Sequence, residues 1–281
     1  MINSYNFNHI NVYNSLTSIE LILFSIIFLC IGSFISSVIY RLSPNTSKDI
    51  SIFFPRSFCP DCEKQIKLIY LIPLLGFILQ KGKCSYCNNS ISSSYPITEL
   101  IFLFTGIYLL FLYGINIVLF FLFSIFSLLY ILFLLDFKFY LLPFSINLLL
   151  IFLGFLSNYL FEMFIISDLY PSSISPLVFS SLGFVVGFSS LWIINFIFKL
   201  IYKKDGIGGG DFLLYGALGA VFGPISLPII MFLGSLFGCL LYMSFIKRFK
   251  KEIPLGSCLV LGSIFYFIFI NFELFNALLV I

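Results

Sequence analysis

The stretch from Ile115 to Lys138 reads INIVLFFLFSIFSLLYILFLLDFK, and it decides what kind of fold this chain can have. Residues 115–135 carry no charge and are long enough for a helix that crosses a bilayer, which takes about 20 residues. The apolar run stops at Asp136, two residues before a lysine. The stretch therefore predicts a transmembrane helix with a carboxyl group at one end.

The rest of the 281-residue chain has the same character. It is 60% hydrophobic and 10% charged, whereas soluble domains average about 45–50% apolar and about 25% charged residues. The sequence predicts an all-α polytopic membrane protein with about eight transmembrane helices and a break at Gly223-Pro224. The expected spans are roughly 19–40, 98–113, 115–135, 141–161, 175–198, 212–223, 225–246 and 257–280.

The basic residues give the expected orientation. All 15 Lys and Arg side chains fall in alternate connections, between spans 1 and 2, 3 and 4, 5 and 6, and 7 and 8. Because Lys and Arg accumulate on the cytoplasmic side of a membrane, these connections are predicted to be cytoplasmic and both termini to be outside. The expected location is a bacterial inner membrane, with the lipid bilayer as partner. The net charge of +3 gives no reason to expect a nucleic-acid partner.

The only long polar segment, residues 41–97, contains two C-x-x-C pairs. Cys59 and Cys62 form the first pair and Cys84 and Cys87 the second, with 21 residues between them. Two such pairs are typical of a tetrahedral four-thiolate zinc site. Because four protein ligands leave no open position for substrate, the zinc is expected to be structural. The alternative is two separate redox or disulfide pairs, which a reducing cytoplasm disfavours.

Two aspartates are the candidates for catalysis. Asp136 ends the third span, and Leu142-Pro143 follows it; Asp211 ends the run GIGGGD just before the sixth span. Placing an ionisable residue inside a membrane costs free energy, so such residues mark candidate functional sites. Two close carboxyl groups cannot both ionise easily, so one would act as a proton donor and the other as the base that activates water.

Simpler interpretations exist for both residues. Asp211 could serve only as a helix N-cap, a common use of aspartate, and Asp136 could pair with Lys138 in a solvated turn. The one histidine of the chain, His9, lies in a polar N-terminal stretch, so a hydrolase with a histidine base is not expected. A transporter would place its acids near the bilayer midplane.

Taken in order, the motifs of the chain resemble those of the type IV prepilin peptidases, also called leader peptidase/N-methyltransferases. The resemblance covers nearly the whole chain. It rests on Gly32-Ser33-Phe34 with Val38 to Leu42, Pro55 to Cys62, Ile72 to Gly76, Lys81 to Cys84, Ile91-Ser92, Tyr95 to Leu100, Asp136 with Leu141-Leu142-Pro143, Gly208 to Asp211, and Ile253 to Gly256. The G-x-G-D motif alone is weak, but the ordered set is specific.

This resemblance implies an aspartic endopeptidase that cuts the short basic leader of prepilins or pseudopilins at the cytoplasmic membrane face. Asp136 and Asp211 would be catalytic, with Gly208, Gly210 and Pro143 as supporting residues. It also implies S-adenosylmethionine-dependent methylation of the new N-terminus and a role in type IV pili or type II secretion.

The corresponding domains are a tail with the first span (1–40), a zinc-binding loop (41–97) and a peptidase domain (98–281). Two alternatives stay open: a non-catalytic assembly factor that docks through the zinc loop, and a protease with the same G-x-G-D chemistry for another class of substrate.

Overall fold

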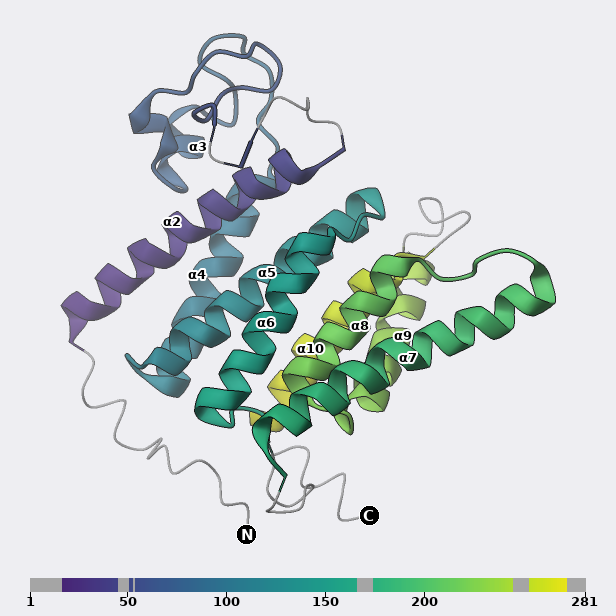
Figure 1. The fold of residues 1–281 in the computed structure, drawn as a ribbon. Coiled ribbons are helices and arrows are strands. Elements are labelled where there is room, and N and C mark those ends of the chain that lie inside the picture. Colours follow the sequence, from purple (N-terminus) through teal and green to yellow (C-terminus); the bar gives the residue numbers. More distant parts are fainter. Residues whose placement is uncertain (1–16, 45–50, 53, 166–173, 245–252, 272–281) are drawn as a thin grey trace. The chain divides into compact units, whose positions relative to one another are not determined.

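The computed structural model describes residues 17–44, 51–52, 54–165, 174–244 and 253–271, and this part of the chain is built from helices (Figure 1). In chain order they are α2 (Ser18–Leu42), the 3₁₀ helix η1 (Leu68–Leu71), α3 (Leu75–Leu79), α4 (Ser94–Tyr113), α5 (Ile117–Phe139), α6 (Phe144–Phe161), α7 (Pro176–Tyr202), α8 (Gly209–Phe222), α9 (Ser226–Ser244) and α10 (Leu255–Asn271).

Five of these helices are long and apolar enough to cross a membrane: α2, α4, α5, α6 and α7. Three further apolar helices, α8, α9 and α10, are shorter. The predicted helical, apolar fold is therefore confirmed for the described residues. The number of crossings stays a prediction, and so do the three domain boundaries. His9 and the ends of the chain lie outside the described residues.

Local sequence signals set the helix ends. Thr17 caps α2 through a reciprocal pair of hydrogen bonds. The Thr17 hydroxyl accepts from the backbone N–H group of Glu20, and the Glu20 carboxylate accepts from the backbone N–H group of Thr17. Helix α5 continues to Phe139, so Asp136 lies inside its last turn and not just beyond the helix, as the predicted span implied. Pro143 precedes α6 as its N-cap.

The predicted break between the sixth and seventh spans is also present. Helix α8 ends at Phe222, and Gly223 takes a φ of 83° before α9 begins. Glycine is the residue that reaches positive φ without steric cost. The chain can therefore turn sharply between two adjacent helices.

The helices form two compact units, Tyr5–Phe123 and Ser124–Ile281. In the first unit α2 packs against α4. The backbone of Gly32 on α2 approaches α4 so closely that a Cβ there would lie 2.9 Å from the Cα of Glu99. Phe123 completes this core, with its ring centroid 4.8 Å from that of Phe28 and 5.7 Å from that of Phe102.

Helix α8 is the centre of the second unit. It contacts α6, α7, α9 and α10, and 10 of its 14 residues are buried. A helix that is apolar on all sides is a buried helix. The position of Asp211, near the first residue of α8, is therefore set by four neighbouring helices.

Small residues bring α7 and α8 into backbone contact. A Cβ on Gly183 of α7 would lie 1.9 Å from the carbonyl oxygen of Gly219 on α8, and a Cβ on Gly219 would lie 2.0 Å from that of Gly183. Such small-residue contacts are typical of helix pairs in membranes, where close approach provides the van der Waals attraction. The contact leaves no space for a larger residue at either position.

A buried asparagine secures the other end of α8. Asn158 of α6 is fully buried, and its side-chain amide donates to the carbonyl oxygens of Ala220 (3.0 Å) and Val221 (2.9 Å). The last carbonyls of a helix have no partner within the helix. Asn158 supplies one from α6, so the C-terminal end of α8 is held by another helix.

We expect the substitution Gly183→Ala to destabilise the second unit, because the new methyl group meets backbone and no side chain can rotate away. Overpacking of this kind costs about 2–3 kcal/mol. Thermal unfolding of the purified protein in detergent should therefore shift to a lower midpoint. Gly209→Ala is the matched control, since nothing lies within 4 Å of a Cβ there. Equal midpoints for the two variants would contradict the expected packing.

Candidate functional site

The carboxyl group of Asp136 is buried and bound to the start of α10. Its side chain is 5% exposed, and its Oδ2 atom accepts a hydrogen bond from the backbone N–H group of Ser257 (2.5 Å) and another from the Ser257 hydroxyl (2.8 Å). N–H groups in the first turn of a helix have no partner within the helix and attract anions. Asp136 therefore points into the protein, and the interpretation of a solvated turn does not apply to it.

Asp211 is the third residue of α8, and it does not cap the helix. The N-cap is Gly208, which has no side chain to bond with. The Oδ1 atom of Asp211 is buried and has no hydrogen-bond partner among the described residues. Its carboxyl group lies close enough to that of Asp136 for the two to interact electrostatically, and the N–H groups of Gly208 and Gly256 face it. The structure thus brings the two predicted aspartates together at the start of α10.

Leu142 packs between the start of α8 and the start of α10. A Cβ on Gly210 would lie 2.8 Å from the Cβ of Leu142, and a Cβ on Gly256 would lie 2.9 Å from its Cδ1 and 3.1 Å from the Oδ2 atom of Asp136. Any larger residue at Gly256 would therefore press on the carboxyl group. None of the glycines in the run before Asp211 has a positive φ. The run is therefore needed because it lets neighbouring residues pack closely against the backbone.

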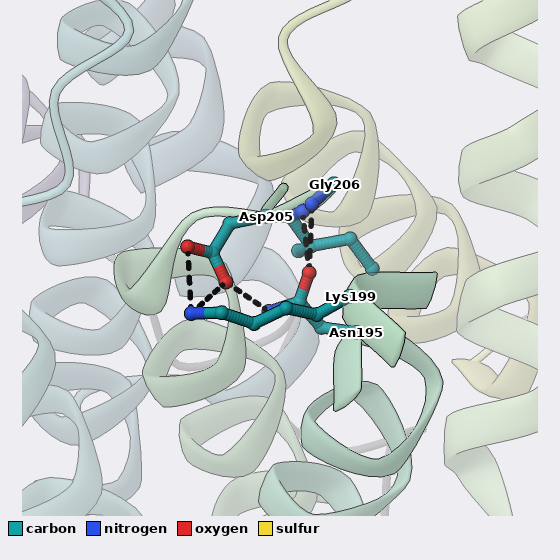
Figure 2. A network of polar contacts seen from close by, with 5 residues as sticks. Asn195, Lys199, Asp205 and Gly206 are labelled. Atoms are coloured by element: carbon teal, nitrogen blue, oxygen red, sulfur yellow. Dashed lines mark hydrogen bonds and ion pairs between the residues drawn. The ribbon is translucent and has the colours of Figure 1, made fainter. Parts of the chain in front are cut away.

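A polar network fixes the loop that leads to Asp211 (Figure 2). Asn195 of α7 is only 8% exposed, and its Oδ1 atom accepts from the N–H groups of Gly206 (2.8 Å) and Ile207 (3.0 Å). Its amide nitrogen donates to Asp205 at 3.2 Å. One side chain thus satisfies the backbone of the loop and sets where the glycine run begins.

Asp205 also forms an ion pair at the surface of this network. The Nζ atom of Lys199 lies 3.1 Å from its Oδ1 atom. The Lys199 ammonium and the Asn195 amide hold the pKa of Asp205 below its ordinary value. Both charged side chains are more than half exposed, so the pair contributes little to stability. The buried amide of Asn195 is the stronger anchor of the loop.

The four predicted cysteine ligands meet in the first unit. All four sulfur atoms lie within 4.8 Å of one another. The Sγ atoms of Cys59 and Cys87 are 3.9 Å apart, and those of Cys62 and Cys84 are 4.0 Å apart. Tetrahedral zinc with bonds of about 2.3 Å places its sulfur ligands about 3.8 Å apart. The four free thiols therefore fit a zinc ion, and disulfide pairs are not formed.

The two C-x-x-C pairs have the same backbone structure. In the first, the Cys59 N–H group donates to the carbonyl of Lys64; in the second, the Cys84 N–H group donates to that of Asn89. The residue after each pair, Glu63 or Asn88, has a φ of 57°. The N–H groups of Cys87 and Tyr86 lower the pKa of the Cys84 thiol to about 7. At Cys84 these N–H groups therefore favour the thiolate that a metal requires.

Two side chains tie the cysteine loop to the helices of its own unit. The guanidinium of Arg41, at the end of α2, donates to the carbonyl oxygens of Ser51 (2.7 Å) and Pro55 (2.6 Å). Glu99 of α4 is 6% exposed, and its carboxylate accepts from the N–H group of Leu74 at 2.7 Å. The loop therefore has a fixed connection to each of the helices that flank it.

Ser257 and Asn195 contribute to the site although the sequence did not point to them. Asn195 did carry a signal, because a polar amide inside a long apolar span needs a partner in the protein. Ser257 carried a weaker one, since it directly follows the motif Ile253 to Gly256. Its contact with Asp136 joins residues 121 positions apart.

Comparisons with known proteins find the same family along most of the chain. The bacterial peptidase A24 N-terminal domain matches residues 26–113, and the type IV leader peptidase family matches residues 122–243. A prepilin leader peptidase/N-methyltransferase of Vibrio cholerae is 32% identical over 89% of this chain and 96% of its own length. Proteins with the same name from Neisseria gonorrhoeae (32% identical, 75% of this chain and 77% of the relative) and Klebsiella pneumoniae (36%, 74% and 87%) also match. No solved structure matches.

We expect one zinc ion per chain in the purified protein, measured by elemental mass spectrometry. The variant Cys84→Ser should lose it, because three thiolates bind zinc much more weakly than four. Cys30→Ser is the control, since Cys30 is exposed and belongs to α2. Zinc content that stays at one per chain in Cys84→Ser would contradict the four-thiolate site.

We expect Asn195→Ala to loosen the loop before Asp211. The exposed Lys203 and Lys204 lie in this connection. Limited trypsin digestion should cut there about 10-fold faster in the variant, since the N–H groups of Gly206 and Ile207 lose their acceptor. Lys199→Gln is the control, because it removes only the surface ion pair and should leave the rate within about twofold. Mass spectrometry of the fragments identifies the cut. Equal rates for Asn195→Ala and the unaltered chain would show that Asn195 does not anchor the loop.

Proposed function

This chain belongs to the type IV leader peptidase family, and we propose that it removes the leader of prepilins with the carboxyl groups of Asp136 and Asp211. The family match makes it a prepilin peptidase. One observation supports the assignment of the residues: the buried carboxyl group of Asp136, from α5, interacts with that of Asp211, from α8, beside the first turn of α10.

The proposed chemistry is hydrolysis by a pair of carboxyl groups that share one proton. The ionised group takes a proton from water, whose oxygen then bonds to the carbonyl carbon of the scissile peptide. The protonated group gives its proton to the carbonyl oxygen. When the C–N bond breaks, the proton held by the first group passes to the leaving amine and the second group recovers its own. Both carboxyl groups then return to their starting states.

We propose that the eight apolar helices cross the inner membrane, with both termini outside and the cysteine loop in the cytoplasm. The alternation of basic residues supports this topology. Helix α8 has 14 residues and is about 21 Å long, whereas the hydrocarbon core is about 30 Å thick. The basic connection before α8 supports a cytoplasmic start for this helix, so Asp211 would lie within about 9 Å of the cytoplasmic boundary, where a basic leader meets the hydrophobic helix of a prepilin.

The zinc is proposed to be structural. Four thiolates fill its coordination sphere and leave no position for substrate. When bound, the ion would hold the two C-x-x-C turns of a polar loop together, and Arg41 and Glu99 would connect that loop to α2 and α4.

A second activity, methylation of the new N-terminus with S-adenosylmethionine, is proposed from the names of the relatives. Mass spectrometry of a co-expressed prepilin would test it directly. A leaderless N-terminus that carries one methyl group would support both activities, and a leaderless one without it would support the peptidase alone.

Co-expression with a cognate prepilin also tests the aspartates. Asp136→Asn and Asp211→Asn should each reduce cleavage at least about 10³-fold, because neither amide can exchange the required proton, while zinc content stays unchanged. Glu162→Gln, at the end of α6, is the matched carboxyl-to-amide control and should cleave normally. Full cleavage by either aspartate variant would refute the mechanism. It would favour an assembly factor in which only the cysteine variants lose function.

A further inference from the structure

The environments of the two carboxyl groups differ, and the difference suggests which group plays which role. We propose that Ser257 holds Asp136 in its ionised form, so that Asp136 is the base that activates water and Asp211 is the acid. This inference rests on the proposed peptidase function. It makes Ser257 a positioning residue, because it acts on the substrate only through Asp136.

The hydrogen bonds of Asp136 favour its ionised form. Two donors from Ser257 converge on the Oδ2 atom, and donors to a carboxylate stabilise the charged state. The Ser257 hydroxyl also lies 3.1 Å from the carbonyl oxygen of Phe133. Its single proton can serve only one acceptor well, and a charged oxygen at 2.8 Å is the stronger one. Among the described residues no donor is bonded to Oδ1, which leaves that atom to receive the proton from water.

The surroundings of Asp211 favour the protonated form. Its Oδ1 atom is buried without a hydrogen-bond partner in the described part of the chain. The N–H groups of Gly208 and Gly256 face this carboxyl group and favour its ionised form. An ionised Oδ1 without a partner, beside the negative charge of a second carboxyl group, is nevertheless unfavourable on both counts. A protonated Oδ1 would instead present a donor, and a substrate carbonyl oxygen is the acceptor that this donor lacks.

The opposite assignment is also possible in geometric terms, and it makes a different prediction. If Asp136 held the proton, Oδ2 would donate to the Ser257 hydroxyl, which would then donate to the carbonyl of Phe133. Ser257 would in that case stabilise the protonated form of Asp136. Removing the hydroxyl therefore separates the two assignments, because it affects opposite limbs of the pH profile.

The experiment measures kcat/KM for prepilin cleavage against pH with the purified full-length protein and its zinc. In Ser257→Ala the acidic limb should move to higher pH by about one unit, since a lost charge-assisted hydrogen bond makes the base easier to protonate. Activity on that limb should fall about 10-fold, and the alkaline limb should stay in place. Ser257→Thr, which keeps the hydroxyl, should restore the profile.

Ser263→Ala is the matched control. Ser263 is a buried serine of the same helix, and among the described residues its hydroxyl bonds only to the carbonyl of Val260 in its own helix. Its profile should equal that of the unaltered protein. If Ser257→Ala shows no thermal unfolding transition, Ser257→Cys takes its place and should give a smaller shift in the same direction, because a thiol is a weaker donor.

Two results would overturn the inference: an acidic limb that does not move in Ser257→Ala, or an alkaline limb that moves to lower pH. Either outcome leaves the proposed function intact as long as Asp136→Asn and Asp211→Asn are inactive. Activity in those two variants would instead remove the proposed function itself.

Discussion

The backbone contact between α7 and α8 is the constraint on which the second unit depends. The contact is possible only because Gly183 and Gly219 face each other. It allows α8 to be enclosed by four helices although it is only 14 residues long. Asn158 then satisfies carbonyl groups at one end of α8. At the other end Asn195 holds the loop that leads to Asp211, so the position of that carboxyl group follows from the packing of its helix.

Helix dipoles and hydrogen bonds both act on the charge of the two aspartates. Asp211 lies in the first turn of α8, where a helix dipole favours an anion by about 0.3–1 kcal/mol, and Asp136 lies in the last turn of α5, where it disfavours one. The first turn of α10 faces Asp136 and favours an anion there as well, so the dipoles do not decide which group is ionised. A hydrogen bond to a charged acceptor contributes about 1.5–3 kcal/mol, and Asp136 accepts two from Ser257. The larger effect is the reason why we assign the negative charge to Asp136.

The sequence was informative where the signal is local. Long apolar runs located the apolar helices α2 and α4 to α10 of Figure 1 to within a few residues, except that α10 is described only as far as Asn271. The short helices η1 and α3, inside the cysteine loop, were not predicted. The spacing of the cysteines predicted a cluster, because metal ligands must converge whatever the rest of the fold does. The extension of α5 past Asp136 was missed, since a carboxylate next to Lys138 looks like the start of a solvated turn. The carboxylate is instead bound by Ser257, 121 residues away in the chain.

The glycine run before Asp211 shows the same limit. Its composition allowed either positive φ or close packing, and only the fold could decide, because the packing partner of Gly210 is Leu142 from the α5–α6 connection. The unpartnered Oδ1 atom of Asp211 could not be predicted either. A buried polar atom without a partner costs about 1–3 kcal/mol, and such a state persists only where the surrounding structure leaves no alternative. The enclosed position of α8 meets that condition. A substrate carbonyl would supply the missing hydrogen bond, so the cost borne by the free protein would favour binding of the group that is to be cleaved.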